Sequence, residues 1–147
     1  GSGNIHSHRL RIEGFAQVMK EKAEDYTLVD VQVTQDDSDI AYAATKKALE
    51  GHPEINCIYI TTSGSAPGVC KALEELKRKS AVTVIAFDDN KENKELMQNG
   101  SIDVLLCQES FRQGYDAINH LFHYLVEGTA PKACYFTHTV IKIAENL

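Results

Sequence analysis

Two adjacent carboxylates end the apolar run VTVIAFDDN (residues 82–90), at the point where a strand predicted for residues 81–88 must stop. A carboxylate in such a place can accept hydrogen bonds from a ligand, cap the next helix, or join further acidic residues in metal or phosphoryl chemistry. The other predicted strand ends supply no convincing partners for that chemistry. Asp89 is therefore expected to be the N-cap of the following helix, and Asp88 is a candidate ligand acceptor.

A second polar stretch, TTSGSAPG (residues 61–68), lies between a predicted strand and a predicted helix. A glycine-containing turn in that position can hold a phosphate through backbone N–H groups and the helix dipole. The stretch lacks both the Gly-Lys-Ser/Thr ending of a P-loop and the GxGxxG pattern of a dinucleotide site. The sequence favours a turn and helix cap, with the hydroxyls of Thr61, Thr62 and Ser63 available to a polar ligand.

The elements that must position these residues alternate between helix and strand. Apolar periodicity and end signals predict helices at 7–24, 39–51, 66–79, 91–100 and 111–127, and strands at 27–33, 56–62, 81–88, 102–108 and 140–144. Such alternation predicts an α/β fold of three αβα layers around a mainly parallel sheet. Ligands of open parallel sheets bind at the carboxyl ends of the strands, which points to the loops 34–37, 61–66, 87–90 and 108–110.

Composition limits the classes of protein that fit. The chain has 147 residues, 43% of them hydrophobic and 24% charged, which suits one globular domain. Its net charge of −6 disfavours a basic nucleic-acid groove, and it has no apolar run or signal-type segment that predicts a membrane association. The four cysteines form no CxxC pair, so we expect buried free thiols in a reducing, cytoplasmic setting, with no metal and no cofactor. Residues 1–3 are interpreted as a cloning remnant.

Three segments in this order and spacing carry a family resemblance: HRLRIEGF (8–15), VIAFDD (84–89) and GSIDVLLCQESFRQGYDAINHL (100–121). Together they resemble the effector-binding domain of the LacI/GalR family of bacterial transcription regulators, whose fold is shared with periplasmic sugar-binding proteins. The resemblance implies that residues 4–147 form the C-terminal lobe of a two-lobed, type I periplasmic-binding-protein-like domain. Most of the first lobe, the helix-turn-helix and the hinge helix would then lie outside this sequence.

The resemblance also implies ligand-binding residues. Arg11 occupies the place of an arginine that contacts ligand hydroxyls, and Asp88 matches an aspartate that accepts from sugar hydroxyls in many members. Gln108 matches a glutamine at the crossover between lobes, where it either lines the cleft or forms a hinge hydrogen bond. Where many members carry Asn-Asp after the middle strand, this chain has Thr62 and Ser63, which leaves the identity of the effector open.

An aromatic residue that several members place near the second βα loop is replaced here by residues 35–39. Asp36 or Asp37 is expected to face that region instead. Stacking on a sugar face would then fall to Phe87 or to an aromatic residue of the absent lobe.

The predicted helix 111–127 carries an apolar stripe at 4-3-4-3 spacing, formed by Phe111, Tyr115, Ile118, Phe122 and Leu125. Burying five such side chains is worth roughly 8–15 kcal/mol, comparable to the net stability of a domain. The resemblance implies that residues 109–128 pack on the first lobe. Without that lobe, we expect the helix to fold back on the sheet or to pair with a helix of another chain.

Three functions fit these observations. The favoured one is an effector-binding lobe, for a sugar, of a homodimeric LacI-type regulator that contacts DNA only through a helix-turn-helix outside this sequence. Effector binding would close the lobes and control DNA binding allosterically, without enzymatic catalysis. The alternatives are a lobe of an extracytoplasmic sugar-binding protein for transport or sensing, and a flavodoxin-like phosphate- or flavin-binding protein that uses residues 61–68.

Overall fold

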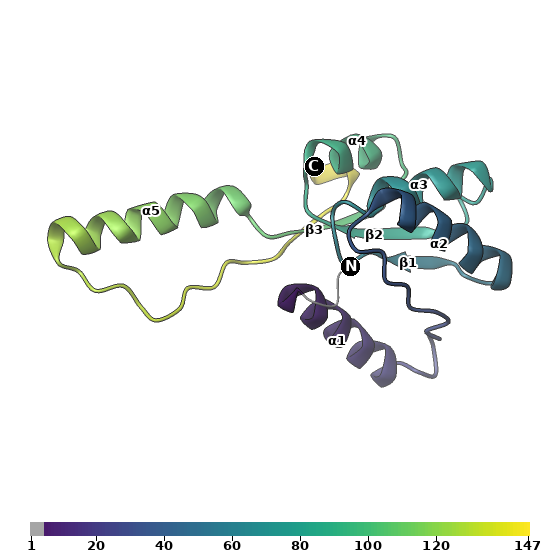
Figure 1. Ribbon diagram of the computed structural model, residues 1–147, viewed down its shortest axis with the longest axis horizontal. Helices are drawn as coiled ribbons and strands as arrows, with labels where there is room; N and C mark the ends of the chain where they lie inside the picture. The colour runs from purple at the N-terminus through teal and green to yellow at the C-terminus, as the bar shows by residue number, and fades with distance from the viewer. Residues whose placement is uncertain (1–4) are drawn as a thin grey trace.

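A four-stranded sheet forms the centre of the molecule. The computed structural model describes residues 5–147, so the interpretation of residues 1–3 lies outside the described residues. The strands are β1 (Cys57–Tyr59), β2 (Thr83–Phe87), β3 (Val104–Cys107) and β4 (Val140–Lys142), in that spatial order. β1, β2 and β3 are parallel, and β4 runs antiparallel to β3 (Figure 1). The predicted α/β fold with a mainly parallel sheet is confirmed.

The helices begin and end close to the predicted positions. They are α1 (His6–Glu21), α2 (Ser38–Gly51), α3 (Ala66–Glu75), α4 (Lys91–Gln98) and α5 (Ser110–Glu127), followed near the C-terminus by the 3₁₀ helix η1 (Ala144–Asn146). Local signals explain several of these ends: the Asp37 side chain caps α2 by accepting from the Ile40 N–H, and Gly128 ends α5 in the left-handed region. Within the described chain, no helix has the length and apolarity to cross a membrane.

The two faces of the sheet are covered unequally. On one face, Val84, Ala86 and Leu105 are fully buried in a core shared with α3 and α4. Neighbouring strand residues point to the opposite face, where those of β3 are only partly buried. α1 covers part of this second face by stacking Phe15 on Tyr59 at a centroid distance of 4.4 Å. Helices therefore lie on both faces, as three layers require.

α2 and α3 approach each other more closely than any side chain would allow at one point. A Cβ atom added to Gly68 of α3 would lie 1.8 Å from the backbone oxygen of Ser38 in α2. Small buried residues, Ala41 of α2 and Ala66 of α3, continue this packing. The glycine therefore sets the spacing of the two helices.

Residues 27–33 are not a strand, so that prediction is wrong. The segment runs without regular structure between α1 and α2 (Figure 1), and Leu28, Val31 and Val33 are 45%, 57% and 63% exposed. An alternating apolar pattern becomes a strand only where a neighbouring strand supplies hydrogen bonds and a surface to pack on. Within residues 5–147, β1 pairs only with β2, and no strand lies beside residues 27–33.

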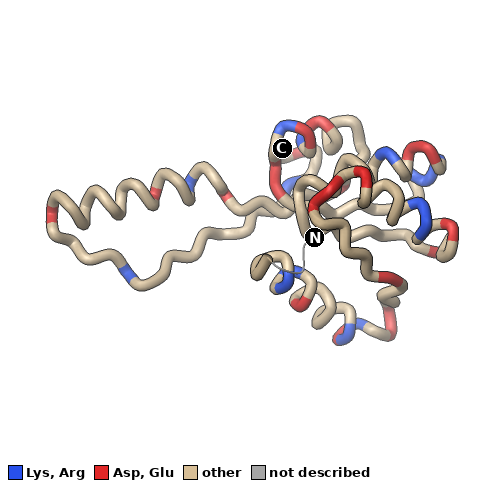
Figure 2. Tube along the Cα trace, in the orientation of Figure 1, with Lys and Arg blue, Asp and Glu red and all other residues tan. Residues whose placement is uncertain are grey.

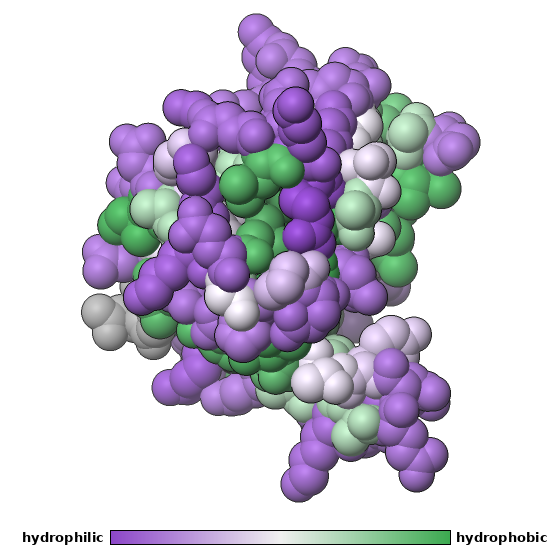
Figure 3. Space-filling view, turned by 90° about the vertical axis from the view of Figure 1, so that its right-hand side faces the viewer, coloured by the Kyte–Doolittle hydropathy of each residue, from purple (hydrophilic) through white to green (hydrophobic). Residues whose placement is uncertain are grey.

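α5 projects from the body together with the segment that returns to β4 (Figure 1). Its stripe is open, with Phe111, Ile118 and Leu125 at 86%, 68% and 70% exposure, and Figure 2 shows few charges along it. The opposite end of the molecule is mostly hydrophilic, with smaller apolar groups between the polar ones (Figure 3). The expectation that the helix folds back on the sheet is therefore wrong, while its pairing with another chain or lobe stays a prediction.

The cysteines divide into two classes, so the expectation of uniformly buried thiols is only half right. Cys70 and Cys107 are buried, whereas Cys57 and Cys134 are exposed. Burial raises the pKa of Cys70 to about 12, and burial also raises the pKa of Cys57 and Cys107. Since the thiolate is the reactive form, Cys70 should be inert in the folded protein.

Thiol titration with a chromogenic disulfide at pH 8 checks this division. Cys134 is expected to react first, Cys57 more slowly, and Cys70 and Cys107 only after denaturant is added. Single Cys→Ser variants assign each phase. Reaction of Cys70 in the folded protein at the rate of Cys134 would contradict the burial described.

Candidate ligand site at the carboxyl edge of the sheet

The parallel strands bring three predicted site segments to one edge. Thr61 and Thr62 follow β1, Asp88 follows β2, and Gln108 follows β3, so their side chains start from the same end of the sheet. Gln108 Nε2 donates a hydrogen bond of 2.7 Å to Asp88 Oδ1. The edge therefore joins residues that lie far apart in the sequence.

Arg11 reaches the same edge from α1. Its guanidinium donates to the backbone oxygen of Thr61 at 2.7 Å and lies 3.8 Å from the centroid of the Phe87 ring, the residue directly before Asp88. A guanidinium carries five N–H donors, so these contacts leave donors for a ligand. Arg9, two residues earlier on α1, makes an exposed ion pair with Glu13 at 3.5 Å.

The turn that carries Asp88 is held firmly. Asp88 adopts a left-handed backbone with φ of 64°, a conformation that aspartate accepts more readily than most residues. The fully buried Asn93 donates from Nδ2 to the backbone oxygens of Phe87 and Asp88 at 3.0 and 3.1 Å, and the Asp88 N–H donates to the Leu106 oxygen at 3.0 Å. The backbone from which the Asp88 side chain extends is therefore held by three hydrogen bonds.

The 61–68 loop is bound together internally. Thr62 is 1% exposed, and its hydroxyl donates to Ser65 Oγ at 3.0 Å. The Gly64 N–H donates to Asp36 Oδ1 at 2.8 Å. The Asp36 carboxylate therefore already binds the backbone N–H that a phosphate in this loop would need. Thr62 and Asp36 thus support the loop rather than face a ligand, while Ser63 stays half-buried at the surface. This arrangement disfavours a phosphate in the loop.

Phe87 lies too deep for the stacking role suggested for it. The side chain is 7% exposed, with the Arg11 guanidinium over the ring and Tyr59 in an edge contact at 5.9 Å. Its ring supports Arg11 through a cation–π contact, so a sugar-stacking aromatic must come from elsewhere.

The comparisons with known proteins agree with this architecture. Residues 1–129 match the family model described as a periplasmic binding protein domain. The chain belongs to this family.

Several solved structures that resemble this chain are sugar-binding proteins or solute-binding proteins with a bound sugar. A glucose-galactose binding protein of Geobacillus stearothermophilus shares 24% identity and a TM-score of 0.84, covering 95% of this chain and 49% of that protein. An arabinose binding protein of the same organism shares 25% identity and a TM-score of 0.88, covering 99% and 52%. An ABC transporter solute binding protein of Agrobacterium vitis, bound with alpha-D-tagatopyranose, shares 18% identity and a TM-score of 0.89, covering 99% and 48%. The chain spans about half the length of these proteins.

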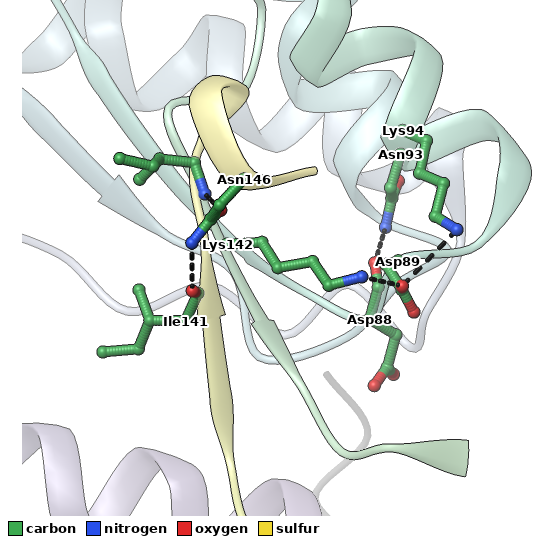
Figure 4. Close-up of polar contacts among 8 residues, drawn as sticks. Asp88, Asp89, Asn93, Lys94, Ile141, Lys142 and Asn146 are labelled. Atoms are coloured by element: carbon green, nitrogen blue, oxygen red, sulfur yellow. Dashed lines mark hydrogen bonds and ion pairs between the residues drawn. The ribbon is translucent and has the colours of Figure 1, made fainter. Parts of the chain in front are cut away.

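Asp89, at the rim of this periplasmic-binding-protein lobe, has a different role from the expected one. Asn90 is the N-cap of α4, accepting from the Asn93 N–H at 2.8 Å, so the prediction of an Asp89 cap is wrong. Asp89 Oδ2 instead accepts from Lys142 Nζ at 2.6 Å and lies 3.5 Å from Lys94 Nζ (Figure 4). No local sequence pattern predicts this pair, because its members are 53 residues apart.

The ion pair predicts a pH dependence of stability. The hydrogen bond from Lys142 lowers the pKa of Asp89, and Asp89 raises the pKa of Lys142. A lowered carboxyl pKa adds stability that is complete above the unfolded value near 4 and is lost as pH falls through the folded value. The raised lysine pKa adds stability below about pH 10 that is lost as pH rises through its folded value.

Asp89→Asn should therefore lower the free energy of unfolding by up to about 1 kcal/mol at pH 7, since the pair is partly screened by solvent. The difference from the wild type should shrink below pH 4, as measured by urea denaturation at several pH values. Glu95→Gln, which alters the more exposed pair with Lys91, serves as the control. An equal difference at pH 3 and pH 7 would contradict the assignment.

Proposed function

We propose that this lobe binds a sugar at the carboxyl edge of its sheet. The observation that carries the proposal is the contact of the Arg11 guanidinium with the Thr61 carbonyl and the Phe87 ring, at the edge of the sheet from which the acceptor Asp88 also extends. The similarity to sugar-binding proteins of known structure supports it.

The chemistry of the edge suits vicinal hydroxyl groups. A sugar hydroxyl both donates and accepts, so it can donate to the Asp88 carboxylate while its neighbour accepts from Arg11. Gln108 donates a hydrogen bond to Oδ1 of Asp88, and none of the described residues donates to Oδ2. Oδ2 is therefore available to accept from a ligand hydroxyl. Each charge-assisted hydrogen bond is worth about 1.5–3 kcal/mol, enough for a small set of contacts to determine affinity. Binding of this kind requires no bond making or breaking, so the proposed role is non-enzymatic.

The proposed pocket is completed by a second lobe. Two observations support such a partner: the apolar stripe of α5 is exposed, and this chain matches only about half the length of the similar sugar-binding proteins. A sugar would be enclosed between the two lobes, and closure would be the signal that ligand binding produces.

Within this class, we favour the effector-binding lobe of a cytoplasmic, homodimeric LacI-type regulator, with DNA bound by a separate helix-turn-helix. Residues 8–15, 84–89 and 100–121 support this role through their resemblance to that family. The second candidate is an extracytoplasmic sugar-binding protein, and similarity to an ABC transporter solute binding protein supports it. The residues that precede this segment in the full-length protein distinguish the two: a helix-turn-helix indicates a regulator, and a signal peptide indicates export.

Calorimetric titration of the full-length protein with D-glucose, D-galactose and arabinose tests the proposed function. A saturable, one-site isotherm with at least one sugar is expected. The absence of binding to these sugars and to a wider panel of mono- and disaccharides would contradict it.

A further inference from the structure

The two aspartates after β2 are tied to different connections between the body and α5. Asp88 accepts from Gln108, which lies on the connection from β3 to α5. Asp89 accepts from Lys142 of β4, the strand formed by the chain as it returns from α5. Figure 4 shows Lys142 and Lys94 converging on Asp89, while the Asp88 carboxylate points away from them. One turn thus contacts both the outgoing and the returning segment.

The contacts of Asp88 continue into α5. The backbone oxygen of Gln108 accepts from Gln113 Nε2 at 2.8 Å, and the same nitrogen donates to Thr137 Oγ1 at 3.1 Å. Gln113 lies in the first turns of α5, and Thr137 lies on the returning segment. A row of polar groups therefore runs from the Asp88 carboxylate to both connections of α5.

The Asp89–Lys142 pair is better shielded than the other ion pairs around α4. Its side chains are 34% and 23% exposed, compared with 92% and 63% for Lys91 and Glu95. Partial burial reduces screening, so this pair holds β4 against the turn more effectively than a surface pair would. Because Asn93 fixes the backbone of the turn, a shift of β4 must either break the pair or displace Asp89.

We propose that Asp89 and Lys142 are positioning residues: they hold the Asp88 carboxylate in place against Gln108 and thereby link sugar binding at Asp88 to the placement of α5. The sugar-dependent half of this inference rests on the proposed function. Its structural half is independent of any ligand.

The structural half is tested by ¹⁵N NMR on the 147-residue chain. In Lys142→Met, the side-chain amide signals of Gln108 should move toward those of an unbonded glutamine, and the β4 amides should exchange about fivefold faster. Lys94→Met is the matched control, since it removes the other cation near Asp89 from α4 and should leave the Gln108 signals unchanged. Lys142→Arg, which keeps a cation at this position, should retain the wild-type pattern.

Two results would overturn the structural half. If β4 exchange accelerates in Lys142→Met while the Gln108 signals stay in place, the pair only anchors β4. If neither quantity changes, the pair does not restrain the turn in solution.

The sugar-dependent half is measured in the full-length protein with D-galactose and arabinose. Lys142→Met should weaken binding of the sugar that the wild type binds by about fivefold, whereas Lys142→Arg should keep near wild-type affinity. Unchanged affinity alongside displaced Gln108 signals would overturn the link to ligand binding. If the wild type binds no sugar, the proposed function and the sugar-dependent half fail, while the NMR result still decides the structural half.

Discussion

Gly68→Ala is expected to destabilise the lobe by about 3 kcal/mol, which for a domain of this size can exceed a quarter of its net stability. The added Cβ would lie 1.8 Å from the Ser38 oxygen and 2.9 Å from the Tyr42 nitrogen, both backbone atoms of α2. Backbone atoms in a helix have no rotamer by which to move away, so α2 and α3 must separate and open the core between them. Urea denaturation followed by circular dichroism measures the loss.

Gly14→Ala is the matched control because it makes the same change within α1, where no atom of the described residues beyond the helix's own nearby backbone lies within 4 Å of the new Cβ. There, alanine should be neutral or stabilising by up to about 1 kcal/mol through helix propensity. Equal stability of the Gly68→Ala and Gly14→Ala variants would show that α2 and α3 are not packed as described.

Arg11→Ala is expected to destabilise the lobe by about 2 kcal/mol and to weaken sugar binding at least tenfold. The substitution removes a charge-assisted hydrogen bond, worth about 1.5–3 kcal/mol, and a cation–π contact worth roughly 0.5–2. It also exposes the Phe87 ring to solvent, because the Arg11 guanidinium covers that ring at 3.8 Å from its centroid. Thermal unfolding reports the first effect, and calorimetry with the full-length protein reports the second.

Arg9→Ala separates these effects from a general change in the charge of α1. Arg9 lies two residues earlier, with a side chain 58% exposed, so its loss should change stability by less than about 0.5 kcal/mol. If the two variants behaved alike, Arg11 would have no special role at the edge of the sheet.

Local signals in the sequence predicted most of the fold. Asp37 before α2 and Gly128 after α5 mark helix ends through short-range chemistry that needs no tertiary partner. The apolar runs that became β2 and β3 contribute to the core between neighbours that the same pattern predicts. The common edge of Asp88 and Gln108 follows from parallel topology alone.

The features that the sequence did not reveal depend on partners distant in the chain or outside it. Residues 27–33 have the pattern of a strand but no strand beside them in the described chain. Asp89 resembles an N-cap locally, yet its partner Lys142 is brought to it only after β4 pairs with β3. The depth of Phe87 likewise results from the packing of α1, which a strand pattern does not report.

Sugar binding at this edge is tested most directly by isothermal titration of the full-length protein with one sugar, compared between the wild type and the Asp88→Ala variant. If Arg11 and Asp88 bind the same sugar, Asp88→Ala should raise the Kd at least tenfold. Its circular dichroism should stay close to that of the wild type. The same Kd in both proteins would contradict the placement of the ligand at this edge.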